Sequence, residues 1–259
     1  MSEAARAPEE TPIRDAATVV LLRDGADGIE AWLLTRVNAM VFAAGMSVFP
    51  GGRVDPADAS VPVAGADLPG LAERFGCDLA TAHGLIGAAV RETFEETGVL
   101  LSLPFADLSA ARADVELGRV GFGDLLRAND VAVDGAALHP WARWVTPANE
   151  VRRYDTRFFV AALPETAVAQ DVTTESSEAS WVPVGRAIEQ AQRGERGLMP
   201  PTLVTLSSLL AFGSVAEVTA AAETRDLAPV RPQVRIDGQS VAVELPDGTL
   251  VPIPQRPAS

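Results

Sequence analysis

The chain has 259 residues, 47% of them hydrophobic and 22% charged, a balance typical of globular proteins. Its 21 basic and 35 acidic residues give a formal net charge of −14, which disfavours nucleic acid as a partner. Every basic residue apart from two histidines is arginine, so Schiff-base chemistry and a P-loop lysine are excluded. The one cysteine, Cys77, can form neither an intrachain disulfide nor a thiolate zinc cluster.

Residues 1–14 are polar, and we expect a disordered tail there. They lack the apolar segment behind a basic start that a secretory signal requires. Purely apolar runs are far shorter than the roughly 18 residues of a membrane-spanning helix. A cytoplasmic protein with no membrane-spanning segment is therefore expected.

Turn residues at 24–28 separate apolar runs at 16–22 and 29–35, which predicts a β-hairpin. Residues 41–52, punctuated by glycine and ending in Phe-Pro-Gly-Gly, predict an irregular loop. Residues 58–77 are rich in Ala, Pro, Gly and Asp with little periodicity, and are interpreted as an insertion or long loop.

A helix is predicted over residues 79–97, because apolar residues recur at helical spacing between a capping Asp78 and a Gly98 suited to the left-handed C′ position. Strands are predicted at 99–103, 141–145, 154–162, 179–182 and within 234–253, and helices within 106–128, at 184–193 and at 202–212. This order predicts an α+β fold, an α/β/α sandwich with a mixed sheet flanked by helices.

The predicted helix 79–97 carries Glu92, Glu95 and Glu96, whose spacing places them on one face. A solvated surface would account for such a cluster. Arg91 before it, Gly98 after it and the glycine pair Gly51-Gly52 upstream instead favour a site for a hard divalent cation, best Mg²⁺ or Mn²⁺.

Residues 91–99, Arg-Glu-Thr-Phe-Glu-Glu-Thr-Gly-Val, resemble the second half of the signature of Nudix hydrolases. Residues 49–58 resemble its first half, with Asp58 where the family usually has glutamate and a long insertion between the halves. Residues 33–36, 45–52, 144–147 and 152–159 resemble the long-insert branch of the family, which includes a coenzyme A diphosphatase.

The resemblance implies roles for individual residues. Glu92, Glu95, Glu96 and the carbonyl of Gly51 would hold the metal, and Arg91 would orient the glutamates. The general base would be a signature glutamate, Glu92 or Glu95, or a carboxylate of a late loop, Glu175 or Glu178. Asp58 would occupy the outer acid position or rigidify the insertion. The candidates for substrate binding are Arg36, Arg53 and Gly52.

The implied function is metal-dependent hydrolysis of the pyrophosphate bond in a nucleoside diphosphate linked to another group. Coenzyme A or acyl-coenzyme A is the first candidate substrate, followed by ADP-ribose or a dinucleotide. The alternative is a Nudix-like sensor that binds a nucleotide without cleaving it.

We expect a Nudix-like hydrolase domain at 15–213, interrupted by an insertion at 58–79, and a C-terminal helix and β-hairpin extension at 214–259. Residues 59–77 are predicted to project outside the catalytic core and to tolerate shortening. A homodimer, in which this segment contacts the second subunit, is a further expectation.

Overall fold

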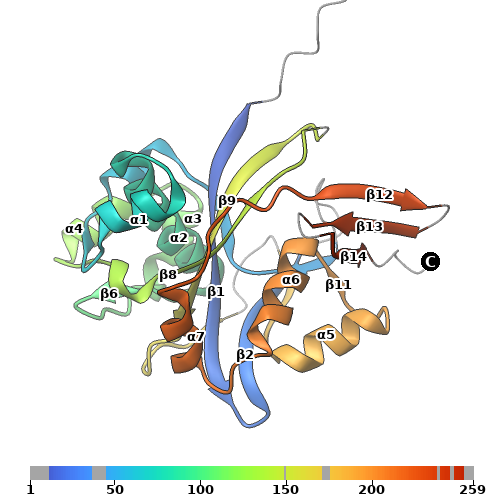
Figure 1. Cartoon of the computed structure of the whole chain (residues 1–259). Helices are drawn as coiled ribbons and strands as arrows, with labels where there is room; N and C mark the ends of the chain where they lie inside the picture. The colour runs from blue at the N-terminus through green and yellow to red at the C-terminus, as the bar shows by residue number, and fades with distance from the viewer. Residues whose placement is uncertain are drawn as a thin grey trace, which may run out of the picture.

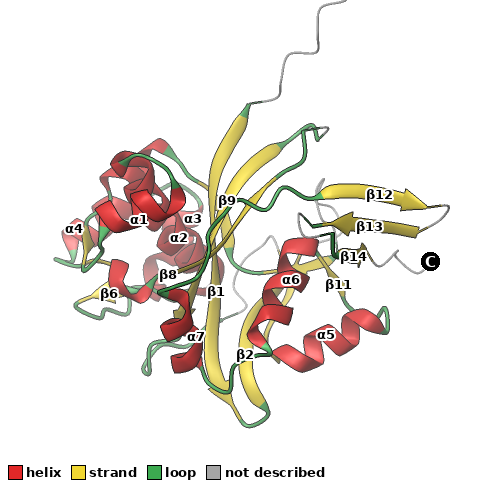
Figure 2. Ribbon diagram, in the orientation of Figure 1, coloured by secondary structure: helices red, strands yellow, loops and turns green. Residues whose placement is uncertain are grey.

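A mixed eight-stranded sheet lies at the centre of the computed structural model, which describes residues 12–36, 45–148, 150–170, 176–237, 240–245 and 248–253 (Figure 1, Figure 2). Its strands are β1 (Ile13–Gly25), β2 (Gly28–Arg36), β3 (Met46–Val48), β4 (Gly51–Arg53), β8 (His139–Val145), β9 (Arg153–Ala162), β10 (Ser176–Pro183) and β11 (Gly197–Leu198). The order is β11-β3-β2-β1-β9-β8, with β10 paired to β2 and β4 paired to β1. β1 is antiparallel to β2, which confirms the predicted hairpin, and parallel to β9.

Helices cover both faces of this sheet, as Figure 1 shows. One face carries α1 (Leu68–Phe75), α2 (Leu79–Thr97), α3 (Arg112–Glu116) and α4 (Phe122–Ala128), and the other carries α5 (Val184–Gln192), α6 (Pro200–Leu209) and α7 (Val215–Ala222). Alternate residues of β1 point to the two faces, Val19 and Leu21 to one core and Val20 and Leu22 to the other. The predicted α/β/α sandwich is confirmed.

Two small sheets flank this sandwich. The first contains β5 (Val63–Ala64), β6 (Ser102–Leu103) and β7 (Ala132–Asp134), so the strand predicted at 99–103 is only two residues long. The second contains β12 (Gln233–Asp237), β13 (Ser240–Glu244) and β14 (Leu250–Ile253), which confirms the predicted C-terminal strands. A domain boundary after residue 213 stays a prediction, although α7 buries apolar side chains in the core that it shares with α5 and α6.

The loop predicted at 41–52 is wrong for its second half. Residues 41–44 lie outside the described part of the chain, but β3 pairs with β2 and β4 pairs with β1. Both strands are three residues long and are formed by pairing with distant segments. Local sequence rich in Gly and Pro does not signal such pairing.

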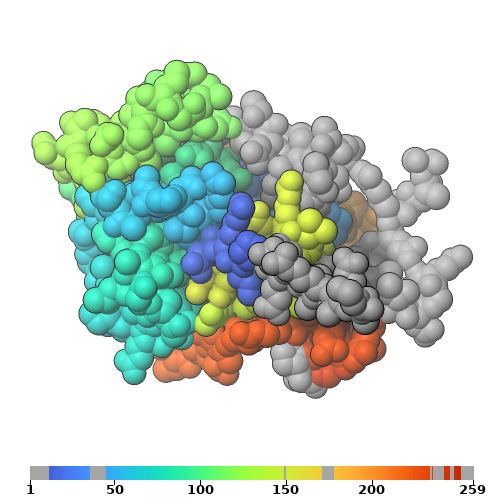
Figure 3. Space-filling view, turned by 90° about the horizontal axis from the view of Figure 1, so that it is seen from above, coloured from blue at the N-terminus to red at the C-terminus, as the bar shows by residue number. Residues whose placement is uncertain are grey.

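The insertion does not project from the core, so that prediction is wrong. It forms the 3₁₀ helix η1 (Pro56–Ser60), strand β5 and helix α1, which begins at the cap Asp67 and ends at Gly76 in the left-handed conformation. Phe75 of α1 is 1% exposed, and its ring meets that of Phe159 on β9 edge-on at 5.7 Å. Figure 3 shows the insertion, in blue to teal, packed beside the green segment that contains α4. The segment is part of the core because every third or fourth residue of α1 is apolar and buried.

Helix α2 confirms the prediction for residues 79–97 at both ends. The Asp78 carboxylate accepts a hydrogen bond from the Thr81 amide at 2.7 Å, and Gly98 adopts a left-handed conformation with φ of 75°. The helix lies in the core shared by the sheet, α1 and α4, which fixes its orientation. Among the described residues, this and the other helices are all too short or too polar to cross a membrane.

Candidate functional site

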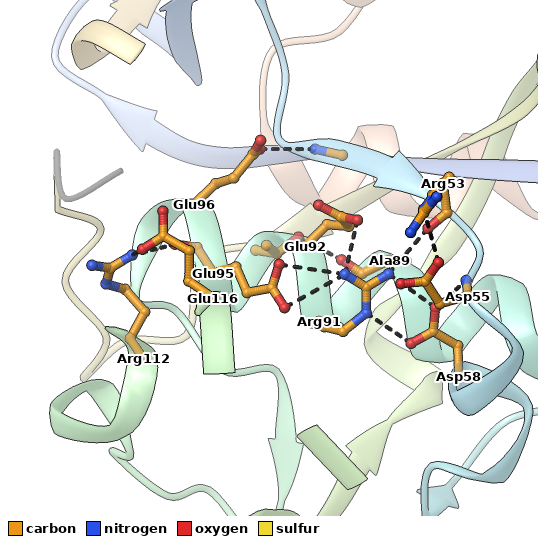
Figure 4. Close-up of polar contacts among 12 residues, drawn as sticks. Arg53, Asp55, Asp58, Ala89, Arg91, Glu92, Glu95, Glu96, Arg112 and Glu116 are labelled. Carbon is orange, nitrogen blue, oxygen red and sulfur yellow. Dashed lines mark hydrogen bonds and ion pairs between the residues drawn. The ribbon is translucent and has the colours of Figure 1, made fainter. Parts of the chain in front are cut away.

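The last turns of α2 bring the signature glutamates against β4, at the edge of a cleft. Figure 4 shows the Glu96 side chain pointing toward the strand above it, while Glu92 and Glu95 point toward Arg91. Glu96 Oε2 accepts a hydrogen bond from the backbone amide of Gly51 at 3.0 Å. The three carboxylates therefore share one helix but lie in different environments.

Arg91 is the centre of a buried ion-pair network (Figure 4). Its Nε donates to Asp58 Oδ1 at 2.8 Å and its Nη2 donates to Asp58 Oδ2 at 2.9 Å, a bidentate pair. Its Nη1 donates to Glu92 Oε1 at 2.8 Å and lies 3.3 Å from Glu95 Oε2. Arg91 thus connects the two halves of the signature across the insertion, and holds two glutamates in place.

Asp58 serves both roles that were considered for it. Its side chain is 2% exposed and pairs with Arg91, in the outer acid position of the motif. It also accepts a hydrogen bond from the Asp55 amide at 2.8 Å and so caps η1. The backbone of η1 approaches α2 closely, since a Cβ on Gly87 would lie 2.4 Å from the Asp58 carbonyl oxygen.

Burial and charge alter the ionisation of this cluster. Burial raises the pKa of Glu95 from 4.5 to about 7, with the Glu92 charge adding to the effect and Arg91 opposing it. Burial alone would lower the pKa of Arg91, but the ion pairs with Asp58, Glu92 and Glu95 outweigh it, so this pKa is raised. Arg91 is therefore a permanent cation.

The glycine pair leaves room for the carboxylates. A Cβ on Gly52 would lie 2.3 Å from Glu92 Oε1, and a Cβ on Gly51 would lie 2.5 Å from the Ala17 carbonyl oxygen. At Gly51 the clash would be with backbone, so glycine lets β4 lie this close to β1, whereas at Gly52 a Cβ would meet only the end of the Glu92 side chain. The backbone of β4 therefore approaches β1 closely at this glycine pair.

A cleft of about 610 Å³ opens next to Glu92 and Glu96. Gly51, Gly52 and Arg53 line it from β4, and Arg152, Tyr154 and Thr156 line it from β9 and the loop before it. A volume of this order suits a nucleotide-sized ligand. Arg152, an arginine suited to phosphate contacts, and Tyr154 both lie within the 152–159 segment that carries part of the resemblance.

The structure separates the other candidates. Arg53 lines the cleft and pairs with Asp55 at 2.8 Å. Glu178 lies exposed on β10, outside the residues that line the cleft, so its assignment as the base stays a prediction. Glu175 and the side chain of Arg36 lie outside the described residues. Glu95 also stands outside the cleft walls, held by Arg91.

The donor set suits a hard divalent cation. Glu92 and Glu96, one helical turn apart, present carboxylate oxygens to the cleft, and the missing Cβ of Gly52 makes space beside Glu92. Within the part of the chain that the structure describes, no three acidic, His or Cys side chains already converge as a metal cluster. The residues present therefore fit an oxygen-ligated cation, with Glu92 and Glu96 as the accessible carboxylates.

Comparison with known proteins places this site in a family context. A model of the NUDT19 Nudix domain matches residues 72–209. The acyl-coenzyme A diphosphatases NUDT19 of Gallus gallus and Homo sapiens are each 29% identical to the chain, over 78% and 74% of it. These matches cover 69% and 64% of the two relatives, and a match to a nudix hydrolase of Caenorhabditis elegans covers 60% of that protein.

A crystal structure of a NUDIX hydrolase from Alicyclobacillus acidocaldarius has the same fold. It superposes with a TM-score of 0.70 at 29% identity, over 85% of this chain and 99% of that one.

Proposed function

The chain belongs to the Nudix hydrolase family, and on that premise we propose that it hydrolyses the pyrophosphate bond of a nucleoside diphosphate linked to another group. The observation that carries the proposal is the placement of Glu92 and Glu96 at the wall of a nucleotide-sized cleft, next to the Gly51-Gly52 backbone. A binding protein would have no need for two carboxylates beside a phosphate ligand, because they repel it. This favours the enzyme over the sensor.

Each residue then has a defined task. Glu92 and Glu96, with the Gly51 carbonyl, would hold the divalent cation, for which we propose Mg²⁺ or Mn²⁺. Glu95, the third expected ligand, is paired with Arg91 outside the cleft walls and would have to turn to reach this cation. When bound, such a cation lowers the pKa of water and neutralises charge on the phosphoryl oxygens. Arg91 fixes the position of Glu92 and Glu95 through its ion pairs. Arg53 from β4 and Arg152 from the loop before β9 would contact phosphate oxygens in the cleft.

For the general base we propose a signature glutamate, Glu92 or Glu95, or a carboxylate of the late loop, Glu175 or Glu178. Glu92 lines the cleft, where the attacking water would lie. Glu95 has its pKa raised to about 7 in the metal-free protein, but Arg91 holds it outside the cleft walls.

For the substrate we propose coenzyme A or its acyl thioesters first, and ADP-ribose or a dinucleotide next. The NUDT19 relatives are named for activity on acyl-coenzyme A, which supports this order. In each case water attacks one phosphorus atom, the bridging P–O bond breaks, and each product leaves with a terminal phosphate monoester.

A substrate panel tests the proposal. Purified protein is incubated with coenzyme A, acetyl-coenzyme A, ADP-ribose and a dinucleotide, with Mg²⁺, Mn²⁺ or excess chelator, and the phosphate monoester products are measured. Cation-dependent hydrolysis of at least one compound supports the enzyme. Binding of a compound without any cleavage would support the sensor instead. Light scattering on the same sample tests the predicted homodimer, and a cytoplasmic location likewise stays a prediction.

A further inference from the structure

A second cavity, of about 310 Å³, continues from the catalytic cleft on the side away from α2. The two share Tyr154, Thr156, Phe158, Met199 and Pro201 in their walls, so they form one connected space. The second cavity extends between β9, the start of α6 and the C-terminal sheet. Figure 1 shows this sheet beside α6.

The walls of this cavity are mainly carbon. Met46 from β3, Trp144 from β8, Pro200 from α6 and Val243 from β13 line it. Elements from four separate parts of the chain therefore converge to make an apolar surface that opens into a polar cleft. Buried apolar surface of this kind has a specific use when it adjoins a site for charged groups, because it can bind the apolar part of an amphiphilic ligand.

The lining favours a flexible chain over a nucleobase. A base is held by stacking on an exposed aromatic face and by hydrogen bonds to its polar edge. Of the three rings in its wall, Trp144 and Phe158 are each only 5% exposed and offer little face for stacking, and the third, the half-buried Tyr154, is shared with the catalytic cleft. Methionine, valine and proline provide carbon contacts without direction, which suit a chain of methylene groups.

We infer that this cavity is an acyl-chain subsite: it binds an unbranched acyl or alkyl chain carried by the substrate while the pyrophosphate lies beside Glu92 and Glu96. The inference rests on the proposed function and narrows it, since it selects acylated substrates over coenzyme A, ADP-ribose and dinucleotides. It also gives the C-terminal sheet a role, because Val243 of β13 forms part of the wall.

The first experiment measures kcat/KM of the full chain for acetyl-, hexanoyl- and decanoyl-coenzyme A with Mg²⁺. We expect kcat/KM to rise by up to about fourfold per added methylene until the chain fills the cavity, and then to level off. Equal kcat/KM across the series, within twofold, would overturn the inference while leaving the proposed function intact. This comparison needs no variant.

A matched pair of variants locates the subsite. Met46 lines the acyl-chain subsite but not the catalytic cleft. Met46→Asp places a charge among the carbon walls and should bring the ratio of decanoyl to acetyl kcat/KM close to one. Met46→Leu conserves volume and should keep the ratio of the unmodified protein. A ratio unchanged in Met46→Asp would show that the chain binds elsewhere and would overturn the assignment.

A binding measurement separates failure of the inference from failure of the proposed function. Acetyl- and decanoyl-coenzyme A are titrated into metal-free protein by calorimetry at two temperatures. The inference expects a lower Kd and a more negative heat-capacity change for the decanoyl compound, because apolar surface is buried. If no compound is hydrolysed but this difference is present, the proposed function fails and the subsite stands. The same Kd for both compounds overturns the subsite.

Discussion

Replacing Asp58 by asparagine tests whether the two halves of the signature depend on each other. The Asp58 carboxylate accepts three hydrogen bonds, from Arg91 Nε, Arg91 Nη2 and the Asp55 amide, at 2.8, 2.9 and 2.8 Å. All three partners are donors. In Asp58→Asn the new amide nitrogen is also a donor, so at least one contact becomes repulsive and the charge that neutralises Arg91 from this side is lost.

The expected cost is about 2–4 kcal/mol of unfolding free energy. Hydrogen bonds to charged groups contribute about 1.5–3 kcal/mol each, and breaking a buried pair costs about 3–5 kcal/mol. The expected loss of unfolding free energy stays below the upper end of this range, because Arg91 is 12% exposed and keeps its contacts with Glu92 and Glu95. We also expect a lower kcat, because Arg91 without its bidentate pair to Asp58 would hold Glu92 and Glu95 less firmly.

Urea unfolding followed by circular dichroism measures the first effect. The control is Asp124→Asn, which removes a surface pair with Arg127 in which the aspartate is 80% exposed, and which should cost no more than about 1 kcal/mol. If Asp58→Asn costs no more than this control, Arg91 is held by the glutamates alone and the proposed coupling across the insertion is wrong.

Three further predictions concern single side chains. Glu96→Gln should lower kcat by at least about 10²-fold without changing the melting temperature, because glutamine can still accept the Gly51 hydrogen bond but binds a cation poorly; activity within a few-fold of the unmodified protein would remove Glu96 from the site. Phe75→Ala should lower the free energy of unfolding in urea by about 3–5 kcal/mol, because the side chain is 1% exposed and packs against Phe159. A loss below about 1 kcal/mol would show that the insertion contributes little to the core. Glu95 has its pKa raised from 4.5 to about 7, so between these values the folded state holds a proton that the unfolded state has lost, and stability falls as pH rises through that window. Glu95→Gln should therefore raise the free energy of unfolding of the metal-free protein, relative to the unmodified protein, more at pH 8 than at pH 5, by at most about 3 kcal/mol. An equal effect at both pH values would contradict the buried, protonated state.

The insertion shows where local sequence reasoning fails. Asp67, Pro69 and Gly76 are the cap, first-turn proline and C-terminal glycine of a helix, and each could have been read as such. The helix is only eight residues long, and its buried Phe75 packs against Phe159, which lies on a strand far along the chain. No pattern within residues 58–77 contains that partner.

The sequence by itself determined α2, its two ends, the carboxylates that it carries and the long strands β1, β2, β8, β9 and β10 of the main sheet, because helical periodicity, caps and β-branched runs are encoded within short segments. It also determined the family, through residues at fixed spacing. Only the tertiary structure decided that Glu92 and Glu95 both pair with Arg91, that Glu92 and Glu96 but not Glu95 line the cleft, that Glu178 lies outside it, and that an apolar space adjoins it. Those facts depend on which distant segments pack together, and that choice is made by burial across the whole chain rather than by neighbouring residues.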